Sequence, residues 1–137
     1  RATGVVRGLA RRSPRLPEPA LLGPLLAVCA AWAVRGLICD AAIAAAYQLD
    51  ASDAQASLLG FARAYHAVLP LTRAELRLLP DLAATRMLTT IAITSTRAAR
   101  YPDNAPYILR NFPAARAGLI ALAALDRTAL LTALESL

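Results

Sequence analysis

The stretch Thr72–Arg100, TRAELRLLPDLAATRMLTTIAITSTRAAR, decides the fold class of this chain. Thr72 with Glu75 three residues later is a capping-box pattern, which marks a helix N-terminus. The residues after it are strong helix formers. Pro80 is expected to end or kink the first helix, because proline lacks a backbone N–H and clashes with the preceding turn. A second helix is predicted from Asp81 to about residue 100, with an apolar face of Ala84, Met87, Leu88, Ile91 and Ser95.

The segments on both sides of this stretch also have helical patterns. Ile38–Leu49 is Ala-rich and has no helix breaker. Ser52 with Gln55 repeats the capping-box pattern and predicts a helix that runs to Pro70. Three more helices are predicted, a short one capped by Asn104, one over Ala114–Leu125 that starts at Pro113, and a terminal one from Asp126 to Leu137. We therefore predict an all-α fold of five or six helices, with Thr3–Val6 as the only short, β-branched strand remnant.

The composition limits both the core and the chemistry. The chain has 137 residues, enough for one domain, and 58% of them are hydrophobic while only 5% are aromatic. The core must therefore consist of Ala and Leu, which favours helices packed closely through small residues. All fifteen basic residues are Arg, against nine acidic residues. Without Lys, Schiff-base chemistry and the nucleotide-binding lysines of kinases are excluded within this chain.

Residues 1–36 form a segment of different character, basic at first and then apolar. Five arginines and three prolines fall within the first 19 residues, and the apolar run Ala20–Val34 is shorter than the roughly 20 residues of a membrane span. The pattern superficially resembles a signal peptide, but such a peptide starts at Met and rarely has so many prolines before its apolar region. We expect an irregular segment over 1–36, a helical unit over 37–137, a cytoplasmic location and no membrane partner. No recognition-helix pattern accompanies the arginines, so no nucleic-acid partner is expected either.

Few residues are candidates for catalysis or metal binding. His66 is the only histidine, which excludes a histidine-based triad or a multi-histidine metal site and favours a structural or surface role. Cys29 and Cys39 match neither metal-ligand nor redox spacing, so we expect reduced, buried thiols. No glycine-rich phosphate loop is present. We predict no catalytic residues and no metal ligands in this chain.

Two charges stand in helices where they need partners. Asp40 lies near the start of an apolar helix, and Arg86 lies in the middle of the long one. They are either solvated or mutually paired charges, or residues that contact a ligand.

An ordered series of segments resembles the aminoglycoside-phosphotransferase-like kinases, and most of all their hydroxylysine-kinase-like branch, which includes modules fused to class III aminotransferases. The resemblance covers about residues 37–125. Upstream, Cys39–Tyr47 is similar to the helix that follows the metal-binding loop in this family. The segments that carry it are CDAAIAAAY (39–47), GFARAYHAVLPLTRAEL (60–76), LPDLAATR (79–86), IAITS (91–95) and RYPDNAPY (100–107).

The resemblance implies a function as well as a fold. These kinases transfer the terminal phosphoryl group of ATP to a small alcohol, with magnesium, in a two-lobed protein-kinase-like fold. Residues 37–137 would be the helical C-terminal subdomain, its partners the missing N-terminal lobe and a small hydroxylated amine or amino acid as acceptor. The residues that would line the acceptor site are Asp40, Tyr47 and Arg86.

The same comparison predicts that this chain is inactive. The family's catalytic loop would precede Arg1, and Arg7–Ala10 stands where the metal-binding Asp is expected. ATP and magnesium are therefore implied for the intact family enzyme and not for this chain. Met87 is the only methionine, which favours a fragment of a longer reading frame, with residues 7–36 from a shifted frame or a replaced segment. The alternative is a helical interaction or scaffold module without catalysis.

Overall fold

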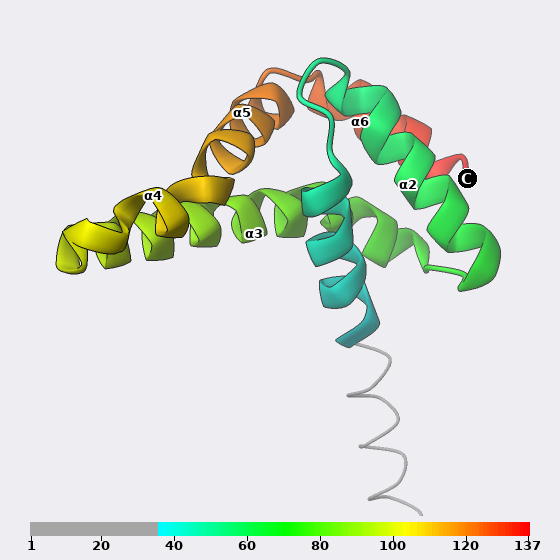
Figure 1. The fold of residues 1–137 in the computed structure, drawn as a ribbon. Coiled ribbons are helices and arrows are strands. Elements are labelled where there is room, and N and C mark those ends of the chain that lie inside the picture. The colour runs from blue at the N-terminus through cyan, green and yellow to red at the C-terminus, as the bar shows by residue number, and fades with distance from the viewer. Residues whose placement is uncertain (1–35) are drawn as a thin grey trace, which may run out of the picture. The chain divides into compact units, whose positions relative to one another are not determined.

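Helices make up the described part of the protein. The computed structural model describes residues 36–137, and within them no strand occurs (Figure 1), which confirms the all-α prediction for this part. The predictions for residues 1–35, including the strand remnant at Thr3–Val6 and the replaced segment, lie outside the described residues. The helices are Gly36–Gln48, α2 (Ala54–Val68), α3 (Arg73–Arg100), α4 (Ala105–Ile108), α5 (Phe112–Ala123) and α6 (Arg127–Glu135), with 3₁₀ turns at Pro102–Asn104 and Leu109–Asn111.

The long helix α3 packs against α4, α5 and α6. Its capping box is confirmed, because the Glu75 N–H donates to Thr72 Oγ1 at 3.3 Å and the Thr72 N–H donates to Glu75 Oε2 at 2.7 Å. Of the two predicted effects of Pro80, an end of the helix is wrong, since α3 continues through this residue and is 28 residues long. An interior proline disfavours a helix by about 3 kcal/mol. Pro80 and its neighbours Leu79 and Ala83 are buried, so tertiary packing outweighs that local preference.

The start of α2 differs from the predicted capping box of Ser52 with Gln55. The N-cap is Asp53, whose Oδ1 accepts a hydrogen bond from the N–H of Ala56 at 3.1 Å. Ser52 instead closes the preceding turn, where its hydroxyl and N–H donate to Asp50 Oδ1 at 2.7 and 2.9 Å. These two bonds, the hydroxyl first, lower the pKa of Asp50. Asp50, Ser52 and Asp53 can each cap a helix, so the sequence alone does not decide which of them is the N-cap.

The C-terminal helices begin close to where they were predicted. Asp126 caps α6 by accepting from the N–H groups of Thr128 and Ala129 at 2.9 and 3.1 Å. Pro113 lies in the first turn of α5, which ends at Ala123, two residues earlier than predicted. Asn104 occupies the N-cap position of α4, but its side chain makes no capping hydrogen bond.

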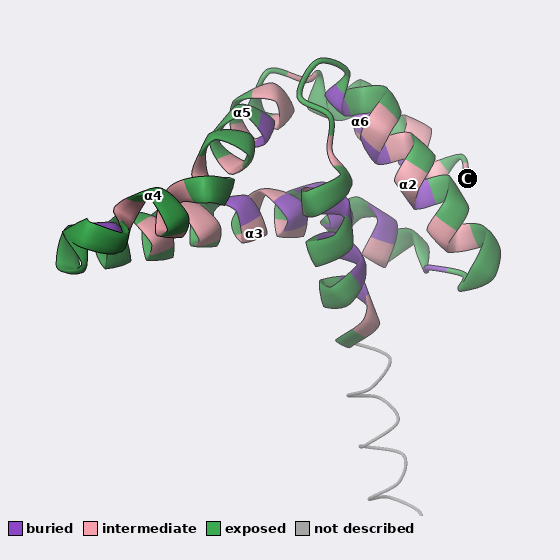
Figure 2. Ribbon diagram, in the orientation of Figure 1, coloured by how far each residue is buried: buried purple, intermediate pink, exposed green. Residues whose placement is uncertain are grey.

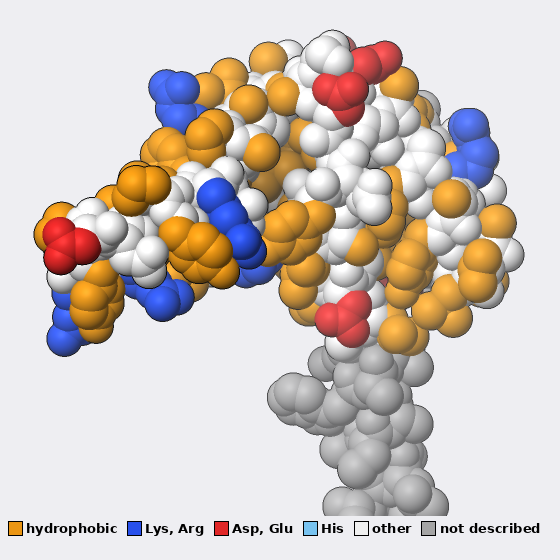
Figure 3. Space-filling view, in the orientation of Figure 1, with side chains coloured by type: hydrophobic (Ala, Val, Ile, Leu, Met, Phe, Trp, Pro, Cys, Tyr) orange, Lys and Arg blue, Asp and Glu red, His pale blue; other side chains and the backbone are white. Residues whose placement is uncertain are grey.

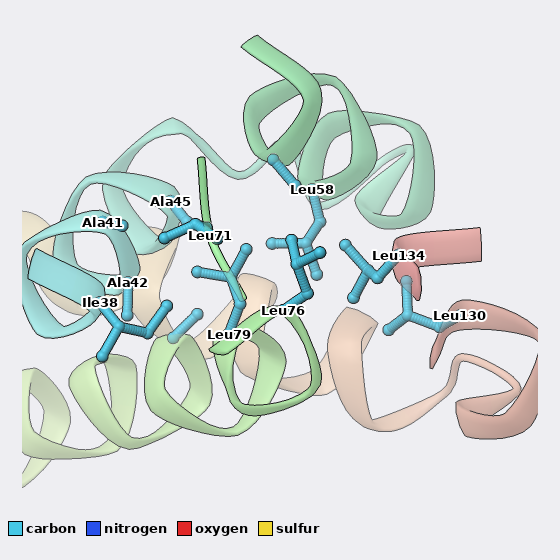
Figure 4. Packing of buried hydrophobic residues seen from close by; sticks show 12 residues of the cluster. Ile38, Ala41, Ala42, Ala45, Leu58, Leu71, Leu76, Leu79, Leu130 and Leu134 are labelled. Carbon is cyan, nitrogen blue, oxygen red and sulfur yellow. The ribbon is translucent and has the colours of Figure 1, made fainter. Parts of the chain in front are cut away.

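The core consists of leucines and alanines, as the composition predicts. Figure 4 shows side chains from the Gly36–Gln48 helix, α2, α3 and α6 meeting at one centre. Leu58, Leu79 and Leu134 are its largest fully buried side chains. Burying each leucine stabilises the fold by roughly 1.5–3 kcal/mol. The cluster comprises Ile38, Ala41, Ala42, Ala45, Leu58, Ala62, Leu71, Leu76, Leu79, Ala83, Leu130 and Leu134.

The predicted apolar face of the second half of α3 is only partly confirmed. Met87 is buried and Ala84 and Ile91 are half-buried, whereas Leu88 is 57% exposed and Ser95 is exposed. Figure 2 shows that burial concentrates in the first half of α3 and thins out toward α4. The buried side of α3 faces α4, α5, α6 and the core cluster that the Gly36–Gln48 helix shares, and it holds Leu76, Leu79, Pro80, Ala83, Met87 and Ala98.

A glycine sets the spacing between α5 and α3. Gly118 is buried in α5, and a Cβ atom there would lie 3.0 Å from Met87 Cε and 3.1 Å from Leu49 Cδ2. Both contacts are tighter than ordinary van der Waals distance, so only glycine allows this approach without displacing a neighbour. The close approach positions Met87 and Leu49 beside the candidate site.

Candidate functional site

A pocket of about 200 Å³ lies where the Gly36–Gln48 helix, α3 and the start of α5 meet. We call it the Arg86 pocket. The three elements contribute residues that are far apart in the sequence, and the tight contact at Gly118 holds its inner wall. Its lining is Ala46, Tyr47, Leu49, Arg86, Met87, Thr90, Asn111, Ala114 and Ala115.

Arg86 and Tyr47 form the polar centre of this pocket. Arg86 Nη2 donates a hydrogen bond to the Tyr47 hydroxyl at 2.8 Å, between residues 39 positions apart in the chain. The guanidinium carbon also lies 5.4 Å from the centre of the tyrosine ring, within the range of a cation–π interaction. These two contacts hold the guanidinium against Tyr47, and only one of its N–H groups donates to the tyrosine hydroxyl.

The guanidinium of Arg86 is incompletely satisfied by the described residues. Its Nε is buried and has no hydrogen-bond partner among them. Leaving a buried donor unpaired costs about 1–3 kcal/mol of stability. None of the ion pairs within residues 36–137 involves Arg86, and no carboxylate lines the pocket. Among the described residues, the pocket therefore holds a fixed positive charge with no compensating carboxylate, while Nε itself is closed off from solvent.

The remaining polar groups of the pocket are neutral. The Thr90 hydroxyl donates to the Arg86 carbonyl at 3.1 Å, which leaves its lone pairs able to accept a hydrogen bond. Asn111 lines the pocket from the position just before α5, and its side-chain amide can both donate and accept a hydrogen bond. The other lining residues are apolar or small. Such a site suits a small ligand with one anionic end and a short uncharged body.

The structure brings together two of the three residues predicted to line an acceptor site. Tyr47 and Arg86 meet in the Arg86 pocket, whereas Asp40 is exposed on the Gly36–Gln48 helix and is not in the lining. Asp40 and Arg86 do not form an ion pair within the described residues. No sequence pattern points to Thr90 or Asn111, because no spacing rule links them to Arg86.

A second arginine lies at another hollow of similar size, about 200 Å³, between α3, α5 and α6. We call it the Arg127 pocket. Arg127 makes a bidentate ion pair with Asp81, with N–O distances of 2.6 and 2.7 Å. The hydrogen bond from Arg127 lowers the pKa of Asp81. Its lining is Pro80, Asp81, Ala84, Leu119, Leu122, Ala123, Leu125, Arg127 and Leu130.

His66 has a structural role, as predicted. Its Nδ1 accepts a hydrogen bond from the N–H of Leu71 at 3.0 Å, which ties the end of α2 to the turn before α3. Cys39 is a free thiol and is exposed, so the prediction of a buried thiol is wrong at this position. The helix turns its alanines inward at positions 41, 42 and 45, which leaves Cys39 on the outer side. Cys29 lies outside the described residues.

Within residues 36–137, no group of three His, Cys, Asp or Glu side chains is placed to hold a metal ion. None of the described helices is by itself long and apolar enough to cross a bilayer; the stretches Pro102–Ala123 and Arg127–Glu135 reach the needed length and composition only as a pair, bent by 92°.

The chain matches no protein-family model, and no match was found among curated proteins or solved structures.

Proposed function

We propose that the described helices are the C-terminal helical subdomain of an ATP-dependent kinase of the aminoglycoside-phosphotransferase type, with a protein-kinase-like fold and a cytoplasmic location. Its acceptor would be a small hydroxylated amine or amino acid. The observation that carries the proposal is the meeting of Tyr47 and Arg86 in one pocket. The ordered resemblance over residues 39–107 is what singles these two residues out as acceptor-lining.

The division of labour follows from what phosphoryl transfer requires. The reaction depends on positioning and on neutralising the charge of the transferred group, through a lysine, magnesium ions and a catalytic Asp. The chain has no Lys and no catalytic-loop motif. We therefore propose that a separate N-terminal lobe supplies ATP and magnesium, while this chain contributes one wall of the acceptor site and no catalytic group.

Reconstitution tests this proposal directly. The 137-residue chain is mixed with the separately expressed remainder of a hydroxylysine-kinase-like enzyme, which carries the nucleotide-binding lobe, the catalytic loop and the metal-binding loop, and ATP-dependent phosphorylation of hydroxylysine is measured. We expect turnover only when both parts are present, and its loss in Arg86→Gln. The matched control is Arg116→Gln, which removes an exposed charge from α5 that does not line the pocket.

Two results would contradict the proposal. One is the absence of turnover although the two parts form a complex. The other is stoichiometric binding of ATP and magnesium by the chain alone, measured by calorimetry, since that would mean a nucleotide site of its own.

A helical interaction module is the second candidate function. It is favoured by large apolar side chains that remain exposed on the described helices (Figure 3). Where such side chains form one contiguous patch, they mark a docking surface. Size-exclusion chromatography separates the two candidates, because a scaffold module gives a defined species while a severed subdomain aggregates through the face meant for its other lobe. The exposed residues include Val68, Leu78, Leu88, Ile93 and Ile120, at 86, 50, 57, 50 and 54%.

A further inference from the structure

We propose that the Arg86 pocket binds the carboxylate of a small hydroxy acid or amino acid, and that it rejects amines that lack a carboxylate. That this ligand is the acceptor of a kinase rests on the proposed function and limits the acceptor to molecules with a carboxylate. That the pocket binds a carboxylate depends only on the pocket itself, so binding and turnover are tested separately.

Among the described residues that line the pocket, Arg86 is the only one with a formal charge. The carboxylates in the described part of the chain are elsewhere, where most of them cap helices or pair with other arginines: Asp50, Asp53, Glu75, Asp81, Asp126 and Glu135. The exposed Asp40 and Asp103 are likewise absent from the lining. A positive ligand would therefore meet an uncompensated guanidinium, which is unfavourable in a partly buried site.

The geometry of Arg86 favours a planar anion. A guanidinium has five N–H donors in a rigid fork that matches the two oxygens of a carboxylate. Tyr47 uses one N–H of Nη2, and the buried Nε is closed to solvent, so the N–H groups of Nη1 and the second N–H of Nη2 are left for an anion. Tyr47 thus acts as a positioning residue, because its hydroxyl and ring hold the fork in place before the ligand arrives.

The size and the other walls of the pocket limit the body of the ligand. At about 200 Å³ the pocket is smaller than the roughly 300–1,000 Å³ of sites for drug-sized ligands. Leu49 and Met87 offer apolar contact for a short carbon chain. Thr90 and Asn111 offer neutral hydrogen-bonding groups for a hydroxyl. A short hydroxylated carboxylic acid satisfies all three features.

The test compares three probes on the full chain by following the Arg Nε–H signals in NMR. The probes are 3-hydroxybutyrate, 4-amino-2-butanol, in which an ammonium-bearing carbon replaces the carboxylate, and inorganic phosphate. The Arg86 signal is identified by its absence in Arg86→Lys. We expect 3-hydroxybutyrate to shift this signal in a saturable way and the amine to leave it unchanged. We expect Arg86→Gln to weaken the binding of 3-hydroxybutyrate, followed on the backbone signals of Thr90 and Asn111, at least tenfold.

Variants separate recognition from loss of structure. Arg86→Lys keeps the charge and loses the fork, so we expect intermediate affinity together with an unchanged melting temperature. Tyr47→Phe keeps the ring and removes the hydroxyl, and we expect a smaller loss than for Arg86→Gln. Arg116→Gln is the matched control and should bind as the unchanged protein does.

Three outcomes would overturn the inference: equal shifts in the unchanged and Arg86→Gln proteins, preference for the amine, or binding of phosphate without binding of 3-hydroxybutyrate. Binding that follows the expected pattern while the reconstituted kinase shows no turnover would leave the carboxylate site standing and refute only the proposed function.

Discussion

The Arg86 and Arg127 pockets lie along the same pair of helices, α3 and α5, and are of similar size, yet their arginines have opposite environments. Arg127 is held by both oxygens of Asp81, while Arg86 contacts a neutral tyrosine and keeps a buried Nε without a partner. Arg127 is 61% exposed and Asp81 49% exposed, so their pair is a surface contact. The difference indicates that Arg127 links helices within the fold, whereas Arg86 is available to a ligand.

The largest expected effect comes from giving Arg86 an internal carboxylate. Ala114→Glu places an acidic side chain in the lining of the Arg86 pocket, where it can pair with the guanidinium as Asp81 pairs with Arg127. We expect the affinity for 3-hydroxybutyrate to fall more than tenfold, equivalent to about 1.4 kcal/mol or more. Titration by NMR measures it.

The matched control for that experiment is Ala114→Gln, which has nearly the same size and no charge. It should reduce affinity less than Ala114→Glu does. Equal losses in the two variants would show that the pocket was merely filled, and the contrast between the two arginines would lose its meaning.

A smaller loss of affinity is expected when α5 is pushed away from α3. In Gly118→Ala the new methyl group meets Met87 and Leu49, and both of these residues line the Arg86 pocket. Overpacking of this kind typically costs roughly 1–3 kcal/mol unless a neighbour can move. Met87 has the adjoining pocket to move into, so we expect a several-fold loss of affinity for 3-hydroxybutyrate with the Arg127–Asp81 pair intact. Unchanged affinity would refute the coupling between this glycine and the pocket.

The same substitution at Gly60 should have the opposite sign. Gly60 is exposed within α2, and a Cβ atom there has no heavy atom within 4 Å. Alanine is favoured over glycine in a helix interior by about 0.5–1 kcal/mol. We expect Gly60→Ala to raise the free energy of unfolding by that amount and to leave both pockets unchanged. Urea denaturation measures the gain, and a loss of stability would contradict the open surroundings of this residue.

The smallest effect is expected at the Arg127 pocket, and it depends on pH. Arg127 holds the pKa of Asp81 below its ordinary value of 3.8 in the folded protein. The carboxylate therefore stabilises the fold above that value, and the contribution is lost as the pH falls through the lower folded pKa. Because the pair is half-exposed, we expect Asp81→Asn to cost no more than about 1 kcal/mol at neutral pH.

The measurement for Asp81→Asn is chemical denaturation of both proteins at neutral pH and at acidic pH. The difference in unfolding free energy should shrink toward zero once the carboxylate is protonated. A difference that persists in acid would mean that the residue acts through packing and not through its charge.

Local patterns in the sequence predict most of the helices. The Thr72–Glu75 capping box, the breakers around residues 50–53 and Pro113 all mark helix ends that the structure has within a few residues. These signals are local because capping bonds and backbone restrictions act within one turn. The errors occur at two places. At Ser52 and Asp53, two neighbouring residues are equally good capping residues, and at Pro80 tertiary packing outweighs the local preference against a helix.

By itself, the sequence determined the fold class, the core built mostly of Ala and Leu, and the absence of a lysine for nucleotide chemistry. Only the tertiary structure decided that His66 ties the end of α2 to the turn before α3, and that α3 runs through Pro80 with few buried positions in its second half. It also decided that Arg86 meets Tyr47 while Asp40 stays outside the pocket. The physical reason is distance along the chain. Helix propensity and capping depend on residues within a few positions, whereas burial and the pairing of charges depend on residues about forty positions apart that packing alone brings together.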